Sequence, residues 1–454
     1  MQSIYFFFAN LMRNMLQMLG LAWLSLGFTA NADSADRPSL AAMEIPGSGE
    51  FASMDLDDAL AKLSDGAALP METRRALEKQ RLFAMLERES APWSMNHPRH
   101  RLLDALLAYQ KYYERSVSDI DKFRTLFKGV NKNQKAILDS AVKYSKKFDR
   151  VEAKLKENQK LCDKISKFGM KYYNISAAEL KKHEHIMKAS GKNMDRVSAS
   201  QSLKHFVRDW TSAGELERKN TFPCLIETMD TMFPERKEAA SPLKVLLPGS
   251  GLNRLAHEIA ALDGFEVVAN EWSTFMNVAY RYLEANPDKN ASTFHPFVDG
   301  WSHHANENDM LRKLSFPERK ADPDSILVVE GDFTTVFATE AGTYDIVLTY
   351  FFIDTARNLM AYFDTIKMVL KPGGKWINLG PLLYGTGPFV QLSLEEVIQV
   401  TEAMGFKYLD TDEKWGDITL EGRTPRGMEA VYSFNDRALT RSAYKAQFWV
   451  AEKK

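Results

Sequence analysis

From residue 243 onward, short apolar runs alternate with longer amphipathic segments, and this alternation limits the fold more than any other feature of the chain. Runs rich in Val, Ile and Leu are typical of buried strands, and apolar residues three and four positions apart are typical of helices. Regular alternation of the two predicts an α/β fold with a mostly parallel, doubly wound sheet. The predicted strands are residues 244–247, 266–269, 326–330, 344–352, 375–380, 406–410 and 444–451, and the predicted helices are residues 252–262, 356–370 and 393–404.

A glycine turn, Pro248-Gly-Ser-Gly251, follows the first of these strands and precedes the first of these helices. Glycines let the main chain approach a ligand closely, and the N-terminus of the following helix offers free amides. Glu271 lies 22 residues after Gly249, at the end of the next strand, where a carboxylate can accept hydrogen bonds from both ribose hydroxyls. The pattern predicts a nucleoside-containing cofactor bound by Gly249, Gly251 and Glu271.

Three further features distinguish between two cofactor classes. The third glycine of a dinucleotide-binding turn is missing, because Asn253 and Arg254 occupy that stretch, and this disfavours a pyrophosphate. Asp332 and Phe333 follow the third strand, and an acidic-aromatic pair suits the amino group and ring of adenine. The domain ends in two strands after its last helix, which is the usual methyltransferase ending with an antiparallel last strand. An S-adenosylmethionine-dependent methyltransferase is therefore favoured over a dinucleotide oxidoreductase.

The region before the sheet divides into four parts. Residues 1–32 are apolar, carry Arg13 as their only charge and end in Ala30-Asn-Ala32, which resembles a secretory signal or a membrane anchor. S-adenosylmethionine is made and kept in the cytosol, so we expect a cytoplasmic protein, with a nuclear pool also allowed, and leave export or anchoring open. Residues 33–75 are predicted to be a polar linker with one short helix near 55–63. Residues 76–198 are predicted to form a helical N-terminal domain, and residues 199–454 the methyltransferase domain, which opens with a helical pair at 199–236.

Composition excludes several classes of protein and partner. The net charge of −1 predicts no general attraction to nucleic acid or anionic membrane. In residues 143–167 acidic residues alternate with the lysines, which favours a solvated helix surface over a nucleic-acid-binding face. Two cysteines provide neither a disulfide framework nor a zinc site. His303 and His304 have no third ligand at a suitable spacing, so we expect no metal.

Four longer motifs connect the chain to a known family: Phe206-Val-Arg-Asp-Trp210, Asn270-Glu-Trp-Ser273, Phe351-Phe-Ile-Asp-Thr-Ala356 and Trp376-Ile-Asn-Leu-Gly-Pro-Leu-Leu-Tyr384. On these motifs, residues 203–453 resemble the carnosine N-methyltransferases, which methylate the imidazole of β-alanyl-histidine to give anserine. The resemblance implies S-adenosylmethionine as cofactor, a histidine-containing dipeptide as substrate, and a helical N-terminal domain that covers the substrate or forms a homodimer.

The resemblance also implies the cofactor contacts. Arg208, with His205 in place of the usual glutamine, would reach the methionine carboxylate. Gly249 and Glu271 would hold the methionyl part and the ribose. The remaining implied cofactor residues are Asp332 and Phe333 at the adenine and Tyr350, which replaces a smaller residue, near the sulfonium.

On the substrate side, the resemblance implies that Asp354 binds the imidazole and that Tyr432 and Tyr444 line the pocket. A carboxylate that accepts the imidazole N–H fixes the tautomer and directs the other nitrogen at the methyl group, so Asp354 and Tyr444 are the candidate catalytic residues. Gly385 stands where the family has a substrate-binding histidine, which leaves the identity of the substrate open.

Structural alternatives to these roles remain. Asp354 could cap a helix that begins near Thr355, Tyr444 could be an ordinary strand aromatic, and Arg208 could pair with an acidic neighbour. His257 is expected to be structural. The long segment 271–326 is expected to overhang the cofactor as part of a lid.

Overall fold

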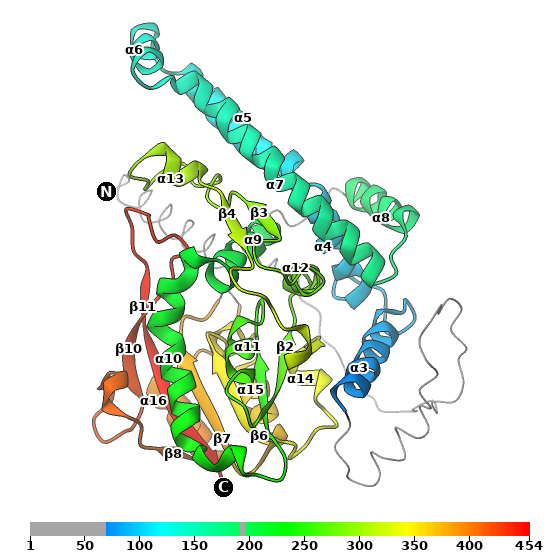
Figure 1. Ribbon diagram of the computed structural model, residues 1–454, viewed down its shortest axis with the longest axis vertical. Coiled ribbons are helices and arrows are strands. Elements are labelled where there is room, and N and C mark those ends of the chain that lie inside the picture. The colour runs from blue at the N-terminus through cyan, green and yellow to red at the C-terminus, as the bar shows by residue number, and fades with distance from the viewer. Residues whose placement is uncertain (1–69, 191–196, 386) are drawn as a thin grey trace.

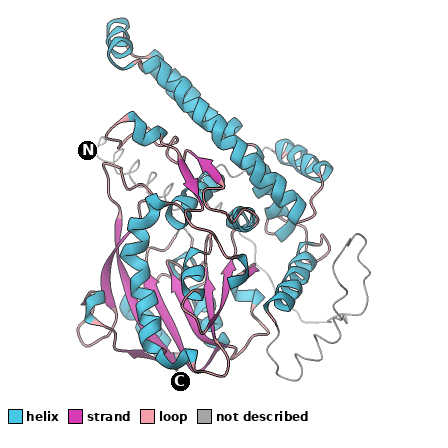
Figure 2. Ribbon diagram, viewed as in Figure 1, coloured by secondary structure: helices cyan, strands magenta, loops and turns pink. Residues whose placement is uncertain are grey.

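The computed structural model describes residues 70–190, 197–385 and 387–454. The expected leader at 1–32 and nearly all of the expected linker at 33–75, including the short helix near 55–63, lie outside the described residues. A sheet domain with helices on both faces lies beneath an elongated helical arm (Figures 1 and 2). In the described part of the chain, no helix is both long and apolar enough to cross a membrane.

The central sheet has the order β5-β2-β1-β6-β7-β11-β10-β9, with β8 also paired to β11. The strands from β5 to β7 are parallel, and β11 runs antiparallel to β7 and β8. The predicted doubly wound sheet with an antiparallel last strand is confirmed. The strands are β1 (Leu243–Pro248), β2 (Phe265–Glu271), β5 (Ile326–Glu330), β6 (Tyr344–Tyr350), β7 (Leu370–Gly380), β8 (Phe406–Leu409), β9 (Asp417–Ile418), β10 (Arg426–Val431) and β11 (Ala443–Lys453).

Alternate residues of these strands enter two separate apolar clusters, because successive side chains of a strand point to opposite faces. Val245 and Leu247 of β1 belong to the cluster that also contains α9–α12, whereas Leu246 belongs to the cluster that contains α14–α16. Both faces are therefore covered. The helices are α9 (Val197–Trp210), α10 (Glu215–Met232), α11 (Arg254–Ala260), α12 (Thr274–Glu284), α14 (Phe333–Val336), α15 (Leu359–Val369) and α16 (Leu394–Ala403).

One predicted helix begins later than expected. The helix predicted for residues 356–370 starts at Leu359, where the Asn358 side chain accepts a hydrogen bond from the Ala361 amide. A short 3-10 turn, Ile353–Thr355, precedes it and contains Asp354. The alternative in which Asp354 caps a helix beginning near Thr355 is therefore wrong.

The arm consists of α4 (Pro98–Gln110), α5 (Tyr112–Lys128), α6 (Lys132–Val142), α7 (Tyr144–Tyr172) and α8 (Ala177–Ala189). The preceding helix, α3 (Met71–Leu86), packs against β5 at the edge of the sheet (Figure 1). Helix α3 begins within the stretch that was expected to be linker. α5 and α7 run side by side, and α6 lies at the far end of the arm (Figure 1). In the basic stretch of α7, Lys154 pairs with Glu157 and Lys156 with Glu152, as on a solvated helix surface.

The segment 271–326 attaches the arm to the sheet. It contains α12, the hairpin of β3 (Ser292–Phe294) and β4 (Leu314–Phe316), and α13 (Glu307–Leu311). α12 packs against α4, α7 and α9, β3 packs against α7, and β4 against α9. The expected lid is thus a packed connection, and its Ser273 and Met276 line the cavity described below.

Candidate active site

The turn after β1 lies where the chain leaves β1 between β2 and β6, the position at which a doubly wound sheet opens a crevice. Gly249 and Gly251 have φ values of 66° and 59°, which favour glycine. A Cβ on Gly249 would lie 2.4 Å from Cδ2 of Phe352, so a larger residue does not fit there. The amide of Gly251 donates to Glu271 Oε2 at 2.8 Å, which fixes the turn against the end of β2.

A cavity of about 310 Å³ opens beside this turn, at the carboxyl ends of β1, β2 and β6 and below α9. It brings together residues that are up to 233 positions apart in the chain, from Gln201 to Phe434. Seven of the predicted site residues line it: His205, Arg208, Gly249, Gly251, Glu271, Tyr350 and Tyr432.

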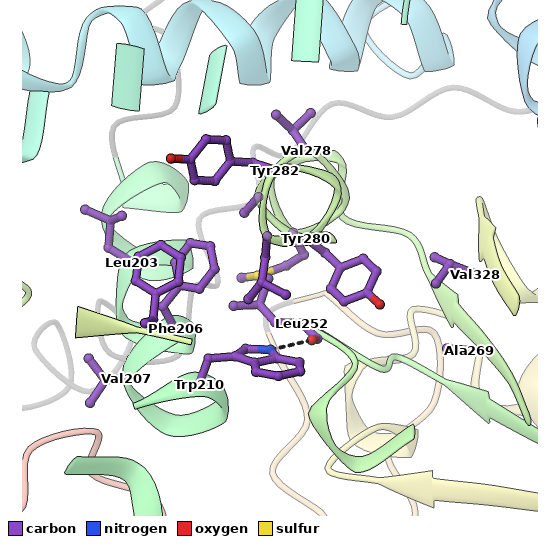
Figure 3. Packing of buried hydrophobic residues seen from close by; sticks show 14 of the residues in the cluster. Leu203, Phe206, Val207, Trp210, Leu252, Ala269, Val278, Tyr280, Tyr282 and Val328 are labelled. Atoms are coloured by element: carbon purple, nitrogen blue, oxygen red, sulfur yellow. Dashed lines mark hydrogen bonds between the residues drawn. The ribbon is translucent and has the colours of Figure 1, made fainter. Parts of the chain in front are cut away.

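Helix α9 is held firmly over the cavity. Its Leu203, Phe206 and Trp210 are fully buried. Phe206 stacks on Phe316 of β4 at 4.0 Å, and the Trp210 Nε1 donates to the carbonyl of Leu252 at 2.8 Å (Figure 3). Residues of α9 on the opposite side of this packed face, three and four positions apart, reach the cavity. They include His205 and Arg208.

Arg208 forms a buried, two-point ion pair with its neighbour Asp209: Nε to Oδ1 at 2.7 Å and Nη2 to Oδ2 at 3.1 Å. Burial opposes both charges, yet each holds the other ionised, so the pKa of Arg208 stays above and that of Asp209 below its usual range. Both side chains line the cavity, and a Cβ on Gly251 would lie 3.4 Å from Arg208 Nη2 and 3.8 Å from Asp209 Oδ2. The pairing alternative for Arg208 is thus real and coexists with a place in the cavity wall.

His205 lies beside this pair as a neutral group. Burial, with a smaller effect of the Arg208 charge, lowers the pKa of His205 to about 3. Its Nδ1 atom is buried and has no hydrogen-bond partner among the described residues. An unpaired buried nitrogen costs free energy, so this atom is available to a ligand in the cavity.

Glu271 is the second buried carboxylate of the cavity. Its Oε1 accepts from the amide of Ser273 at 2.6 Å and its Oε2 from Gly251. Burial raises the pKa of Glu271, although these amides and the charge of Arg101 act in the opposite direction. The carboxylate is therefore oriented at the end of β2 by the backbone on both sides.

Aromatic side chains form the wall at the end of β6. Tyr432 stacks on Phe351 with ring centroids 5.1 Å apart, and Tyr444 meets Phe351 edge-on at 5.8 Å. Phe351 has φ of 50°, an uncommon conformation for a large side chain, which turns the chain sharply after the strand. The Tyr350 hydroxyl pairs with Thr221 Oγ1 at 2.9 Å.

Two polar side chains of α10 fix the segment that carries this wall. Asn220 Oδ1 accepts from the amide of Val431 at 2.7 Å, and Glu217 Oε1 accepts from the amides of Ser433 and Phe434. The turn after β10 is therefore tied to the helical pair that precedes the sheet, and Tyr432 lies between these contacts.

Asp354 is 8% exposed and lies in the turn after β6, three residues beyond Phe351 and outside the residues that line the cavity. Burial raises its pKa to about 7, which the amide of Leu383, donating to Oδ2 at 3.2 Å, offsets only in part. Burial raises the pKa of Tyr444, and the negative charge of Asp354 raises it further, so the two groups interact electrostatically. The next residue, Thr355, lines the cavity.

Five predicted site residues do not line the cavity: Asp354 and Tyr444, described above, and three others. Asp332 is exposed and caps α14 by accepting from the amide of Thr334 at 2.8 Å. Phe333 is 3% exposed and packs edge-on against Phe352 at 5.5 Å. Gly385 is half-buried in the loop after β7. Contacts of all the predicted site residues with a ligand stay predictions.

Sequence reasoning missed an arginine of the arm. Arg101 of α4 lies over the ring of Trp272 at 3.7 Å and donates to the Trp272 carbonyl. Burial lowers the pKa of Arg101 to about 10, while Asp332 and Glu271 act to raise it. The arm thus brings a cation to the two acidic residues predicted to bind the adenosine. No local pattern could have predicted this, since 171 residues separate Arg101 from Trp272.

Asp209 and Phe351 were also missed as site residues, although both lie inside the quoted motifs. Of the histidines set aside from the sequence, His257 is buried and pairs with Tyr280 at 2.8 Å and Ser325 at 3.0 Å, as expected of a structural residue. His304 Nε2 pairs with the carbonyl of Gly300 at 2.7 Å in a loop.

Comparison with known proteins gives the family. A family model described as carnosine N-methyltransferase matches residues 183–454. The carnosine N-methyltransferase of Schizosaccharomyces pombe is 31% identical over 69% of this chain and 84% of its own length. That of Mus musculus is 30% identical over 76% of this chain and 84% of its own length.

Solved structures are more distant. The phosphoethanolamine N-methyltransferase 2 of Haemonchus contortus, solved with S-adenosyl-L-methionine, is 16% identical over 41% of this chain and 39% of its own, with a TM-score of 0.27. The family model covers well over half of this chain, including the α9 cavity face and the whole sheet. The chain therefore belongs to the carnosine N-methyltransferase family.

Proposed function

We propose that this protein transfers the methyl group of S-adenosylmethionine to an imidazole nitrogen of carnosine, giving anserine. The observation that carries the proposal is the isolated buried carboxylate of Asp354, three residues beyond Phe351 of the aromatic wall, beside a cavity that is polar at its other end. Family membership supports both the cofactor and the class of substrate.

The described residues fit S-adenosylmethionine. Its methionyl part carries a carboxylate and an ammonium group, and the buried pair Arg208 and Asp209 is complementary to both. The unpartnered His205 Nδ1 offers a further polar contact. Glu271 is oriented to accept hydrogen bonds from the ribose hydroxyls, and the backbone of the turn at Gly249 and Gly251 lines the cavity, where a ligand can contact it.

When bound, S-adenosylmethionine supplies a methyl group on a positively charged sulfur that a neutral imidazole nitrogen can attack directly. The protein must hold the nucleophile in line with that methyl group. Asp354, as the carboxylate, accepts the N–H of the substrate imidazole, which fixes the tautomer and leaves the lone pair of the other nitrogen directed at the cavity. The same carboxylate stabilises the positive charge that develops on the imidazole.

The aromatic wall has two roles in this proposal. The rings of Phe351, Tyr432 and Tyr444 pack on one another, and in this proposal they keep water away from the bound imidazole, which strengthens its interaction with Asp354. Their faces also attract cations, which favours the sulfonium and the imidazolium. Tyr444, facing Asp354, positions the ring of the substrate.

The direct test is methyl transfer from labelled S-adenosylmethionine to a panel of carnosine, histidine, imidazole and histidine-containing peptides. We expect carnosine to be methylated on one ring nitrogen, as read by mass spectrometry and NMR. Because Gly385 replaces a histidine of the family, the panel includes proteins with accessible histidines. Methylation of a protein histidine with no turnover of carnosine would overturn the substrate assignment while leaving the methyltransferase assignment intact.

We also propose that the enzyme acts in the cytoplasm as a homodimer. Apolar side chains on the arm, Leu126, Ile137 and Val142, are 58–67% exposed, which supports a surface for self-association. Light scattering of the purified protein should give the mass of two chains. A mass of one chain at micromolar concentration would refute the dimer.

A further inference from the structure

Among the described residues, three metal-ligating side chains converge at one place outside the cavity, in the helical arm. His100 and Asp104 lie four positions apart on α4 and therefore on the same helix face, and His183 reaches them from α8. One ligand atom of each lies within 4.8 Å of the other two. Two imidazoles and a carboxylate, drawn from two packed helices, are a typical ligand set for zinc.

The distances are close to those that a metal requires. His183 Nε2 lies 2.7 Å from Asp104 Oδ1, and His100 Nδ1 lies 3.1 Å from Asp104 Oδ2. With metal–ligand bonds of about 2.0–2.2 Å, two ligand atoms on one tetrahedral zinc ion lie about 3.3 Å apart. Small rotations of the side chains would therefore bring all three within bonding distance of one ion.

Burial distinguishes this group from a chance surface cluster. His100 is 8% exposed and His183 is 4% exposed, and their rings meet edge-on with centroids 4.7 Å apart. His100 Nδ1 is buried without a hydrogen bond of acceptable geometry to any described residue, although it lies near the carboxylate. A buried ring nitrogen that makes no hydrogen bond and lies close to a carboxylate oxygen is suited to share a metal ion with that oxygen.

We propose that His100, Asp104 and His183 bind one zinc ion that ties α8 to α4. Two neutral imidazoles and one carboxylate leave a charge of +1 on the complex, and a water molecule would complete the tetrahedron. Because the cluster lies outside the wall of the cavity, the ion would hold the two helices together and take no part in methyl transfer. The cluster has a link to the cavity all the same: the residue after His100 is Arg101, which lies over Trp272 next to Glu271.

The test uses the full-length, tag-free protein, stripped with a chelator and titrated with ZnCl₂ in a calorimeter. We expect one zinc ion per chain, a higher Tm in the presence of zinc, and, with Co²⁺ as a probe, the visible absorption bands of a tetrahedral site. His183→Ala should lower zinc affinity by at least about 100-fold. His185→Ala, which changes an exposed histidine two positions along the same helix, is the matched control and should bind zinc like the wild type.

Two results would overturn the proposal. One is a stripped wild-type protein that is folded by circular dichroism yet takes up no zinc and shows no tetrahedral Co²⁺ bands, which would make the cluster a hydrogen-bonded clamp. The other is equal zinc affinity in the wild type and in His183→Ala. Should His183→Ala fail to fold, Asp104→Asn, which keeps the size of the side chain and removes its charge, takes its place with the same expected loss. None of these measurements depends on methyl transfer.

Discussion

The two ends of the cavity bury charge in opposite ways. At the cofactor end Arg208 and Asp209 neutralise each other, and Glu271 accepts two backbone amides and lies near Arg101, which oppose the rise that burial causes in its pKa. At the acceptor end Asp354 has one amide partner and aromatic neighbours, and its pKa rises to about 7. In the proposed mechanism the compensated charges bind the cofactor, and the carboxylate of Asp354 accepts the imidazole N–H of the substrate. This difference predicts that cofactor binding and methyl transfer can be impaired separately by mutation.

The largest effect is expected from Asp354→Asn. Asparagine keeps the shape of the side chain but cannot stabilise the charge on the methylated imidazole, so kcat/KM should fall by about 10³-fold. The affinity for S-adenosylhomocysteine, measured by calorimetry, should stay within about twofold. Asp364→Asn, on the exposed side of α15, is the control and should be silent. A parallel loss of cofactor affinity in Asp354→Asn would show that Asp354 also supports cofactor binding, which contradicts its assignment to the substrate alone.

Glu271→Ala should weaken cofactor binding and leave turnover largely intact, the reverse of the effect expected for Asp354→Asn. Loss of two hydrogen bonds from ribose hydroxyls to a carboxylate is expected to weaken binding of S-adenosylhomocysteine by about 10²-fold. At saturating cofactor, kcat should recover most of its wild-type value. Glu271→Gln, which retains one acceptor oxygen for the turn amides, separates the structural role from the binding role and should lie between the two. Unchanged cofactor affinity in both variants would place the ribose elsewhere.

The pH dependence of kcat/KM should also differ from that of cofactor affinity. The pKa of Asp354 is raised, so its carboxylate form is lost as the pH falls through about 7, and the ionised fraction rises about tenfold between pH 6 and pH 8. We expect log kcat/KM to rise with pH by more than the titration of the substrate imidazole alone explains. Cofactor affinity should stay flat over this range. An activity profile that follows only the imidazole pKa of the substrate, measured by NMR, contradicts this prediction.

The smallest effect is expected from Arg101→Ala. A cation over a tryptophan face contributes about 0.5–2 kcal/mol, so the KM for S-adenosylmethionine should rise by about three- to thirtyfold with little change in the KM for carnosine. Arg101→Lys retains the charge without the flat guanidinium and should recover part of the loss. An effect on the KM for carnosine alone would move Arg101 from the cofactor end to the acceptor end.

The sheet was predictable because its strands are buried on both faces and read as continuous apolar runs, as in Val245-Leu-Leu247. The strand β10 was not predicted, since Arg426-Gly-Met-Glu-Ala-Val431 has little apolar character and depends on pairing with β11. Helix α15 starts late because Asn358 caps it, a local signal that apolar spacing alone overlooks.

Site residues inside short motifs were predictable, and seven of them line one cavity. Residues that act across long separations were not. Arg101 meets Trp272, and His183 meets Asp104, only because α4, α8 and α12 pack together. Periodicity predicts that such helices exist but not which of their faces meet.

In the proposed mechanism Asp354 accepts a hydrogen bond from the N–H of the acceptor imidazole. The most direct measurement is a crystal structure with S-adenosylhomocysteine and carnosine bound. We predict one imidazole nitrogen within hydrogen-bond distance of the Asp354 carboxylate and the other facing the sulfur of the cofactor product. An imidazole bound elsewhere in the cavity, with Asp354 still paired to the Leu383 amide alone, would contradict the account.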